Sequence, residues 1–339
     1  MTRRALTVRI PGSIAVEQRP ALEPGIDEVV IRPTYCGLCG TDVELLRGSV
    51  DPDYVRYPLT LGHEWSGTIE SVGSAVEGLS PGDRCVAECI VPCGRCAPCR
   101  AGRTNVCETY DELGFTREGG ASDQVVVPAR LVHVLEAEVS LLDAALVEPS
   151  SVVYRALEKA SPESGSHVLV VGDGTIALLA ADLVRLWSPA SVDMIGRRAD
   201  QAELAHAVGV EGFATEGSPE GSYDVTIEAA GASQAVLTAA TASRRGGTVV
   251  LLGLPPTGGT LELPGDLLVN NDLTLSASFG YTSAAWRQTV GLLNERRIQP
   301  GRIVTHRFPL DDYGAAFEAL RATDGARGKV LLEIACARG

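Results

Sequence analysis

The stretch VLVVGDGTIALLAADLV, residues 168–184, constrains the fold of this chain more than any other. It starts as a continuous apolar run of strand length, turns through two glycines and continues with helical periodicity. Further apolar runs of strand length follow as far as residue 286, mostly with helical segments between them. Strands that alternate with helices predict a doubly wound parallel sheet over residues 152–286.

The turn in this stretch has the pattern Gly172-x-Gly174-x-x-Ala177. Glycines at these positions permit a tight turn and the close approach of a pyrophosphate, and the N-terminus of the following helix offers free N–H groups and a positive dipole end. An ordinary glycine-rich turn is the alternative. The strand–turn–helix context favours a dinucleotide site.

The end of the second predicted strand bears on which dinucleotide binds. In SVDMIGRRAD, residues 191–200, Gly196 stands where an acid would bind the ribose 2′-hydroxyl of NAD, and Arg197 and Arg198 follow. Asp193 lies inside the strand, where it could not easily reach the ribose. An arginine can pair with a 2′-phosphate through its bidentate fork, so the pattern favours NADP(H), with NAD(H) as the alternative if both arginines are only solvated loop charges.

The part before residue 152 has a different texture, rich in Gly, Pro and Cys, with short β-type runs between turn signals. This pattern predicts an irregular, mostly antiparallel β domain over residues 1–151. The tail, residues 287–339, combines one or two helices with a closing strand and need not belong to the parallel sheet.

Composition excludes several classes of function. The 339 residues suffice for about two domains. A net charge of −14 disfavours nucleic acid and anionic membranes as partners. No apolar run approaches the ~20 residues of a membrane span, and no signal segment is visible. We therefore expect a cytoplasmic protein with reduced cysteines.

Four cysteines are spaced C-x2-C-x2-C-x7-C, at Cys93, Cys96, Cys99 and Cys107. Reduced thiols at this spacing predict a closed tetrahedral zinc site, which would hold a loop without doing chemistry because four thiolates leave no open position. Free thiols in a lobe without metal are the alternative. Disulfides are disfavoured by the expected compartment and by the odd cysteine count.

A second set of ligand types comes from YCGLCGTDVE and LTLGHEWSG, which supply Cys39, His63 and Glu64. A thiolate, an imidazole and a carboxylate make a zinc site that can keep a position open for water or substrate. A further carboxylate, Glu148, lies at the boundary between the two predicted domains.

Taken together, the motifs resemble those of the zinc-dependent medium-chain alcohol and polyol dehydrogenases. The motifs GLCGTD, GHEWSG, PGDRC, the four-cysteine lobe, EPSSV, the nucleotide turn, TIEAAG, GGTVVLLG and IVTHRFPLDDYGAAFEAL occur in the family's order. Glu148 places the sequence nearer to sorbitol, threonine and cyclitol dehydrogenases, since the liver-type enzymes carry a cysteine there. The resemblance implies a GroES-like catalytic domain, to which residues 287–339 return, and a Rossmann cofactor domain.

The resemblance also implies roles at the open site. Cys39 and His63 match catalytic zinc ligands, and Glu64 matches a carboxylate that binds the metal in some members. Glu148 matches a third protein ligand or one that acts through water. Zinc would act as a Lewis acid on the alcohol oxygen, and hydride would pass to the nicotinamide.

Two residues after the catalytic cysteine match further roles. Thr41 matches the hydroxyl that takes the substrate proton, and Asp42 matches the acid that orients the metal-bound histidine. A plain helix cap is the alternative for both. Many members have a histidine five residues after the cysteine that passes the proton to solvent, but here the position is Glu44. The relay could use Glu44, water or a ribose hydroxyl. The cofactor positions implied by motif and resemblance are Gly172, Gly174, Thr175, Ile176, Arg197, Arg198, Ala230, Leu252 and Gly253.

The substrate is the least determined feature. DELGFTREGGASDQVVVP, residues 111–128, resembles the same stretch of dehydrogenases that act on aminocyclitols and sugars in secondary metabolism. Glu44, Glu64, Arg117 and Tyr54 would suit recognition of hydroxyl or amino groups, so a small polar alcohol or its ketone is expected. Small secondary alcohols or amino-alcohols are the alternative substrates, and a non-catalytic zinc- and nucleotide-binding relative is the alternative of another class. The resemblance implies two zinc ions per chain and a homodimer or homotetramer.

Overall fold

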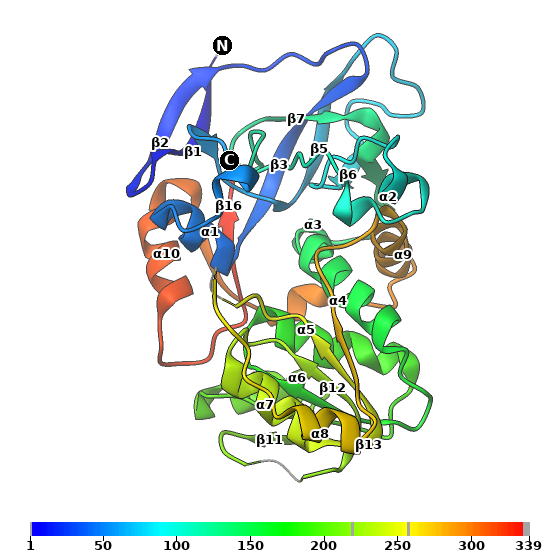
Figure 1. Ribbon diagram of the computed structural model, residues 1–339. Helices are drawn as coiled ribbons and strands as arrows, with labels where there is room; N and C mark the ends of the chain where they lie inside the picture. The colour runs from blue at the N-terminus through cyan, green and yellow to red at the C-terminus, as the bar shows by residue number, and fades with distance from the viewer. Residues whose placement is uncertain (1, 218–219, 256–257, 335–339) are drawn as a thin grey trace. The chain divides into compact units, whose positions relative to one another are not determined.

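In the computed structural model, which describes residues 2–217, 220–255 and 258–334, the chain divides into two units. The β unit consists of Met1–Glu148, Thr282–Arg321 and Lys329–Gly339, and the α/β unit consists of Pro149–Tyr281 and Ala322–Gly328. The chain therefore enters the α/β unit a second time for one short segment, close to its C-terminus (Figure 1).

The α/β unit contains a six-stranded sheet with the order β11-β10-β9-β12-β13-β14. All neighbouring pairs are parallel. This order is the doubly wound one, and it confirms the predicted Rossmann sheet. The strands are β9 (His167–Val171), β10 (Ser191–Ile195), β11 (Gly212–Ala214), β12 (Tyr223–Glu228), β13 (Ser243–Leu251) and β14 (Thr274–Ala277). The helices are α4 (Val147–Ala160), α5 (Thr175–Leu183), α6 (Ala202–Ala207), α7 (Ser233–Ala242) and α8 (Gly265–Asn270), with short 3-10 turns η4 (Val184–Trp187) and η5 (Ala199–Gln201).

Both faces of this sheet are covered. α5 packs on β9, β10 and β12, whereas α7 packs on β9, β12 and β13. The chain moves outward in one direction after β9 and in the other after β12, so right-handed crossovers place α5 and α7 on opposite faces. The sequence reflects this burial, because β9 carries a continuous apolar run and every residue from Ala177 to Leu183 in α5 is buried.

The β unit is built around a seven-stranded sheet and a three-stranded sheet with the order β2-β1-β4. The large sheet has the order β15-β16-β3-β5-β6-β8, with β7 pairing to β3, and only β15 and β16 pair in parallel. This confirms the mostly antiparallel β domain. The strands are β1 (Thr2–Ile10), β2 (Ser13–Pro20), β3 (Glu28–Leu38), β4 (Leu59–Thr60), β5 (Glu64–Val72), β6 (Arg84–Ala87), β7 (Val125–Pro128), β8 (Val132–Val134), β15 (Val304–Pro309) and β16 (Lys329–Glu333).

Short helices connect these strands. They are α1 (Gly40–Arg47), α2 (Ala97–Arg100), α3 (Leu141–Ala144), α9 (Ser283–Asn294) and α10 (Tyr313–Arg321), with 3-10 turns η1 (Pro52–Tyr54), η2 (Thr104–Val106), η3 (Ala129–Leu131), η6 (Pro300–Ile303) and η7 (Leu310–Asp312). None of the helices in the described ranges is long and apolar enough to cross a membrane.

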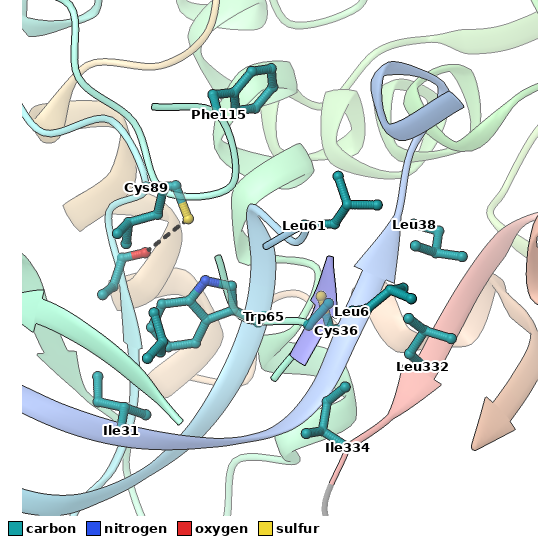
Figure 2. Packing of buried hydrophobic residues seen from close by; sticks show 14 of the residues in the cluster. Leu6, Ile31, Cys36, Leu38, Leu61, Trp65, Cys89, Phe115, Leu332 and Ile334 are labelled. Carbon is teal, nitrogen blue, oxygen red and sulfur yellow. Dashed lines mark hydrogen bonds between the residues drawn. The ribbon is translucent and has the colours of Figure 1, made fainter. Parts of the chain in front are cut away.

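The core of the β unit draws on segments from both ends of the chain. Figure 2 shows Leu6 of β1, Trp65 of β5 and Leu332 of β16 among the buried side chains that pack together. Each of these side chains is at most 2% exposed. Burying a large apolar side chain contributes roughly 1.5–3 kcal/mol, so this core fixes β3 and β5, the two strands that adjoin Cys39 and His63.

Candidate active site and metal centres

Cys39 is the N-cap residue of α1, and its sulfur accepts a hydrogen bond from the N–H of Thr41 at 3.3 Å. The carboxylate of Asp42 accepts a hydrogen bond from the Cys39 N–H at 2.8 Å and closes a capping box. The cysteine is therefore held by the start of a helix as well as by β3, which ends at Leu38. Thr41 and Glu44, on the same helix, are partly exposed.

His63 and Glu64, at the start of β5, lie beside this cysteine. The ligand atoms of Cys39, His63 and Glu64 are all within 4.8 Å of one another. His63 Nδ1 lies 3.8 Å from Asp42 Oδ1, and its Nε2 lies 4.0 Å from Glu64 Oε1. Because Asp42 faces Nδ1, we assign the proton to that nitrogen, which leaves Nε2 as the ligand atom. The thiolate, imidazole and carboxylate fit zinc.

Lys329 of β16, a residue that the sequence did not single out, contacts this site. Its ammonium group forms an ion pair with Glu64, and the two side chains are 1% and 3% exposed. Burial opposes the charged form, but the Glu64 carboxylate raises the pKa of Lys329 above its usual value. A side chain at Gly37 would overlap both partners, since its Cβ would lie 2.3 Å from Glu64 Oε2 and 2.7 Å from Lys329 Cε.

Two more carboxylates are electrostatically coupled to the site. Loss of hydration, with a contribution from the Glu64 carboxylate, raises the pKa of Glu148 to about 8. Burial also raises the pKa of Glu112, while His63 lowers it. Glu148, in the first turn of α4, is not among the three residues of the described chain whose ligand atoms gather within 4.8 Å. Its place near Glu64 is compatible with contact to a metal through water.

The loop that contains Glu112 lies next to the imidazole and carries several polar side chains. The hydroxyl of Tyr110 donates to the Glu112 carboxylate, and the Tyr54 ring packs edge-on against the Tyr110 ring at 4.8 Å. Arg117 pairs with Asp111 at 2.7 Å. One apolar side chain, Phe115, brings its ring to 5.1 Å from the His63 ring.

The four cysteines of the C-x2-C-x2-C-x7-C motif form the second cluster, because their sulfurs also lie within 4.8 Å of one another. Backbone N–H groups of Arg95 and Cys96 lower the pKa of the Cys93 thiol to about 6, which favours the thiolate that binds metal. Cys107 accepts a hydrogen bond from the Cys93 N–H at 3.3 Å. The donor set is that of a closed structural zinc site.

The remaining cysteines that the structure describes belong to neither of the two clusters of metal-ligand atoms. Cys36, Cys85 and Cys89 are each at most 1% exposed and pack in the core of the β unit. Cys336 lies outside the described residues. Burial raises the pKa of Cys85 to about 12, so this thiol stays neutral.

The glycine turn of the α/β unit lies at the carboxyl end of β9. Gly172 has a φ of +130°, a conformation that favours glycine, and Gly174 is the N-cap of α5 with open space around its Cβ position. Ala230 follows β12, and Leu252 and Gly253 follow β13, at the same edge of the sheet. A ligand at this edge would meet the start of α5 at the point where the strand order reverses.

The predicted arginines occupy different environments. Arg197 is exposed, whereas Arg198 forms an ion pair with Asp173 at 3.1 Å and its side chain is 12% exposed. Asp173, the middle residue of the Gly172–Gly174 turn, also accepts hydrogen bonds from the N–H groups of Arg197 and Arg198, at 2.9 and 3.0 Å. Asp173 does not stand out in the sequence, because the glycines around it define the nucleotide motif.

The chain matches two known domain families. The first is the alcohol dehydrogenase GroES-like domain over residues 25–137, and the second is the glucose dehydrogenase C-terminus over residues 142–327. The chain belongs to the zinc-dependent medium-chain alcohol and polyol dehydrogenases. It is accordingly a dehydrogenase of a family that uses zinc and a nicotinamide cofactor, as the resemblance implied.

Individual members of this dehydrogenase family resemble the chain over nearly their whole length. Sorbitol dehydrogenase of Gallus gallus is 30% identical over 97% of this chain and 96% of its own. L-threonine 3-dehydrogenase of Anaeromyxobacter dehalogenans is 32% identical over 94% of each chain. A zinc-binding dehydrogenase of Sinorhizobium meliloti 1021, solved with NADP bound, is 30% identical with a TM-score of 0.91 and covers 98% of this chain and 100% of its own.

Proposed function

We propose that this dehydrogenase transfers hydride between a secondary alcohol of a polyol, sugar or aminocyclitol and a nicotinamide cofactor, with NADP(H) preferred. The observation that carries the proposal is the convergence of Cys39, His63 and Glu64 ligand atoms within 4.8 Å, beside the buried Asp42. When bound there, zinc supplies a Lewis acid that polarises the alcohol oxygen.

The chain's own residues would then position and deprotonate the substrate. Cys39 and His63 hold the metal, and Asp42 keeps the imidazole oriented through Nδ1. Thr41, partly exposed two residues after the cysteine, would take the hydroxyl proton. Glu44, on the next turn of α1, or a water molecule would pass it to solvent.

Lys329 gives Glu64 a defined role in this scheme. The ion pair with the buried Lys329 ammonium engages one carboxylate oxygen of Glu64, Oε2. The other oxygen, 4.0 Å from His63 Nε2, is the one that could reach a metal. We infer that Glu64 binds through that oxygen alone, and that Glu148 acts as a nearby carboxylate or through water.

Polar groups beside the imidazole support a substrate with several hydroxyl or amino groups. Tyr110, Glu112 and Arg117 are within one loop, and Tyr54 packs against it. Similarity to sorbitol dehydrogenase fits a polyol, and similarity to L-threonine 3-dehydrogenase fits the second candidate, an amino-alcohol. Action on an aminocyclitol of secondary metabolism is the narrowest form of the proposal.

A substrate screen tests this function directly. Polyols, cyclitols, aminocyclitols, threonine and simple secondary alcohols are offered with NADP and with NAD, and absorbance of the reduced nicotinamide is followed. We expect the highest kcat/KM with a substrate that carries at least two neighbouring polar groups. Higher activity with simple secondary alcohols would contradict the polyol proposal, and no turnover with any compound, in protein that holds zinc, would favour a non-catalytic relative.

NADP(H) preference rests on residues 196–198. Gly196 removes the strand-end acid, Arg197 is exposed beside it, and the NADP-bound relative has the same fold and 30% identity. A charge-assisted hydrogen bond to a phosphate contributes about 1.5–3 kcal/mol. Such a contribution corresponds to roughly ten- to hundredfold discrimination.

Arg197→Ala is expected to lower kcat/KM with NADP by about tenfold while leaving the value with NAD within about twofold. The reason is the loss of one guanidinium at the 2′-phosphate. Arg155→Ala, which removes a partly buried arginine of α4 in the same unit, is the control. Equal losses of kcat/KM with both cofactors, or a wild type that prefers NAD tenfold, would show that Arg197 does not bind the 2′-phosphate.

The metal content and assembly complete the proposal. We propose two zinc ions per chain, one at each cluster, and a cytoplasmic homodimer or homotetramer. β14 is the last strand of its sheet and has an unpaired edge in the described chain. Val269 and Phe279, close to it in sequence, are 80% and 53% exposed. An open edge next to exposed apolar side chains suits pairing with a second copy.

A further inference from the structure

The space beside Gly196 is filled by a side chain from another segment. A Cβ at Gly196 would lie 2.7 Å from the Cβ of Asp173 and 2.8 Å from the Phe213 ring. A carboxylate at this edge of the sheet therefore comes from the glycine turn, and the strand end has no room for one. Changing Gly196 to an acid would create a clash before it could create a contact with a ribose.

The Asp173 carboxylate binds the turn at Arg197 and Arg198 through several hydrogen bonds. Its carboxylate accepts two backbone N–H groups and the Nε and Nη2 atoms of Arg198, at 3.3 and 3.1 Å. Burial opposes ionisation, but these donors together hold the pKa of Asp173 below its usual value. The charge of Arg198 is therefore balanced inside the protein, and a phosphate would need other cations.

A third arginine, Arg327, comes from the C-terminal segment Ala322–Gly328 and lies next to the glycine turn. Gln201, which is 0% exposed, donates through Nε2 to the carbonyls of Asp173 and Arg327, both at 2.8 Å. The Arg327 N–H donates back to Gln201 Oε1 at 2.9 Å. The hydroxyl of Thr175, the first residue of α5, donates to the Gly328 carbonyl at 2.9 Å. These contacts fix Arg327 next to the nucleotide turn.

Positively charged side chains gather near the glycine turn, although the chain as a whole is acidic. Burial lowers the pKa of Arg327, Arg198 and Arg197 lower it further, and Asp173 raises it. Arg327 is therefore within electrostatic range of Arg197, Arg198 and Asp173, on a chain whose net charge is −14, and its Nη1 donates to the Ala322 carbonyl at 2.8 Å. Like charges held close together destabilise a fold unless an anion binds between them.

We propose that Arg327 binds the 2′-phosphate of the cofactor together with Arg197, and that Asp173 positions Arg198 as a fixed wall of that site. The proposal rests on the proposed preference for NADP(H) and adds the residue that sequence position 196–198 cannot supply. A phosphate carries about −1.5 to −2 charges and would offset the repulsion among these guanidinium groups.

Binding of adenosine fragments tests this without turnover. Calorimetry compares adenosine 2′,5′-bisphosphate with adenosine 5′-monophosphate on the zinc-loaded protein. Arg327→Gln should weaken bisphosphate binding about tenfold and change monophosphate binding less than twofold. The two backbone contacts of Arg327 with Gln201 remain in this variant, which loses the guanidinium's hydrogen bond to the Ala322 carbonyl. Arg327→Lys should keep more than half of the preference for the bisphosphate that Arg327→Gln loses. Arg245→Gln, elsewhere in the same unit, should change neither affinity.

The possible outcomes distinguish the role of Arg327 from the NADP(H) preference on which it rests. A wild type that binds the bisphosphate no better than the monophosphate overturns the NADP(H) preference itself. A wild type that discriminates, together with an unchanged ratio in Arg327→Gln, overturns only the role of Arg327. An equal loss for both fragments assigns Arg327 a structural role and also overturns it.

Discussion

His63→Ala should reduce turnover to less than about one-thousandth of the wild-type value while leaving the melting temperature nearly unchanged. The imidazole is one of three ligand atoms within 4.8 Å, and its other nitrogen faces Asp42. Without it the donor set falls below the three protein ligands typical of a catalytic zinc. Lewis-acid stabilisation is worth several kcal/mol, and each 1.36 kcal/mol corresponds to tenfold in rate.

The measurement is kcat for the preferred substrate, together with zinc per chain by elemental analysis. We expect one zinc in the variant against two in the wild type, and the same result for Cys39→Ser. His167→Ala, an exposed histidine in the α/β unit, is the control and should keep both zinc ions. Turnover close to wild type in a His63→Ala protein that has lost a zinc would contradict the proposed mechanism.

Cys99→Ser should instead damage stability. Cys99 lies in α2, its sulfur is one of four within 4.8 Å, and structural zinc contributes folding free energy directly. Weakening this site by a few kcal/mol would lower the melting temperature by about 10 °C. Loss of the ion would also leave the lobe prone to aggregation.

Zinc content separates this effect from ordinary core damage. Cys85→Ala removes a buried thiol outside the lobe, so it should cost some stability but retain both zinc ions. Cys99→Ser should lose one ion before the global unfolding transition, as followed by a zinc-sensitive dye during heating. A folded Cys99→Ser protein with an unchanged melting temperature would show that the lobe does not depend on metal.

Local sequence patterns were enough to predict the sheet of the α/β unit. The glycine turn, the continuous apolar strands and the helical segments between them are contiguous in sequence, and their alternation predicts a doubly wound parallel sheet. The two clusters of ligand types were also predictable, because their spacing and residue types are specific. The structure places each cluster within reach of a single ion.

Contacts between distant segments could not be predicted in this way. In the sequence, Lys329 is a single lysine at the start of an apolar strand. Its neighbours in the sequence do not indicate that it pairs with Glu64 beside Gly37. Asp173 reads as a turn residue, although its carboxylate fills the space beside Gly196. The predicted contact of Arg198 with a phosphate stays a prediction, and the structure shows the side chain paired with Asp173.

The location of β16 has a consequence for biosynthesis. This strand, Lys329–Glu333, lies between β15 and β3 in the large sheet, although β3 is made near the beginning of translation. On the ribosome, Tyr35–Leu38 of β3 must wait for nearly the whole chain to emerge before β16 pairs with them, and an unpaired edge invites pairing with other nascent chains. Strands of the α/β unit have no such delay, since all six are complete by Ala277. The β unit should therefore mature last and depend most on chaperones.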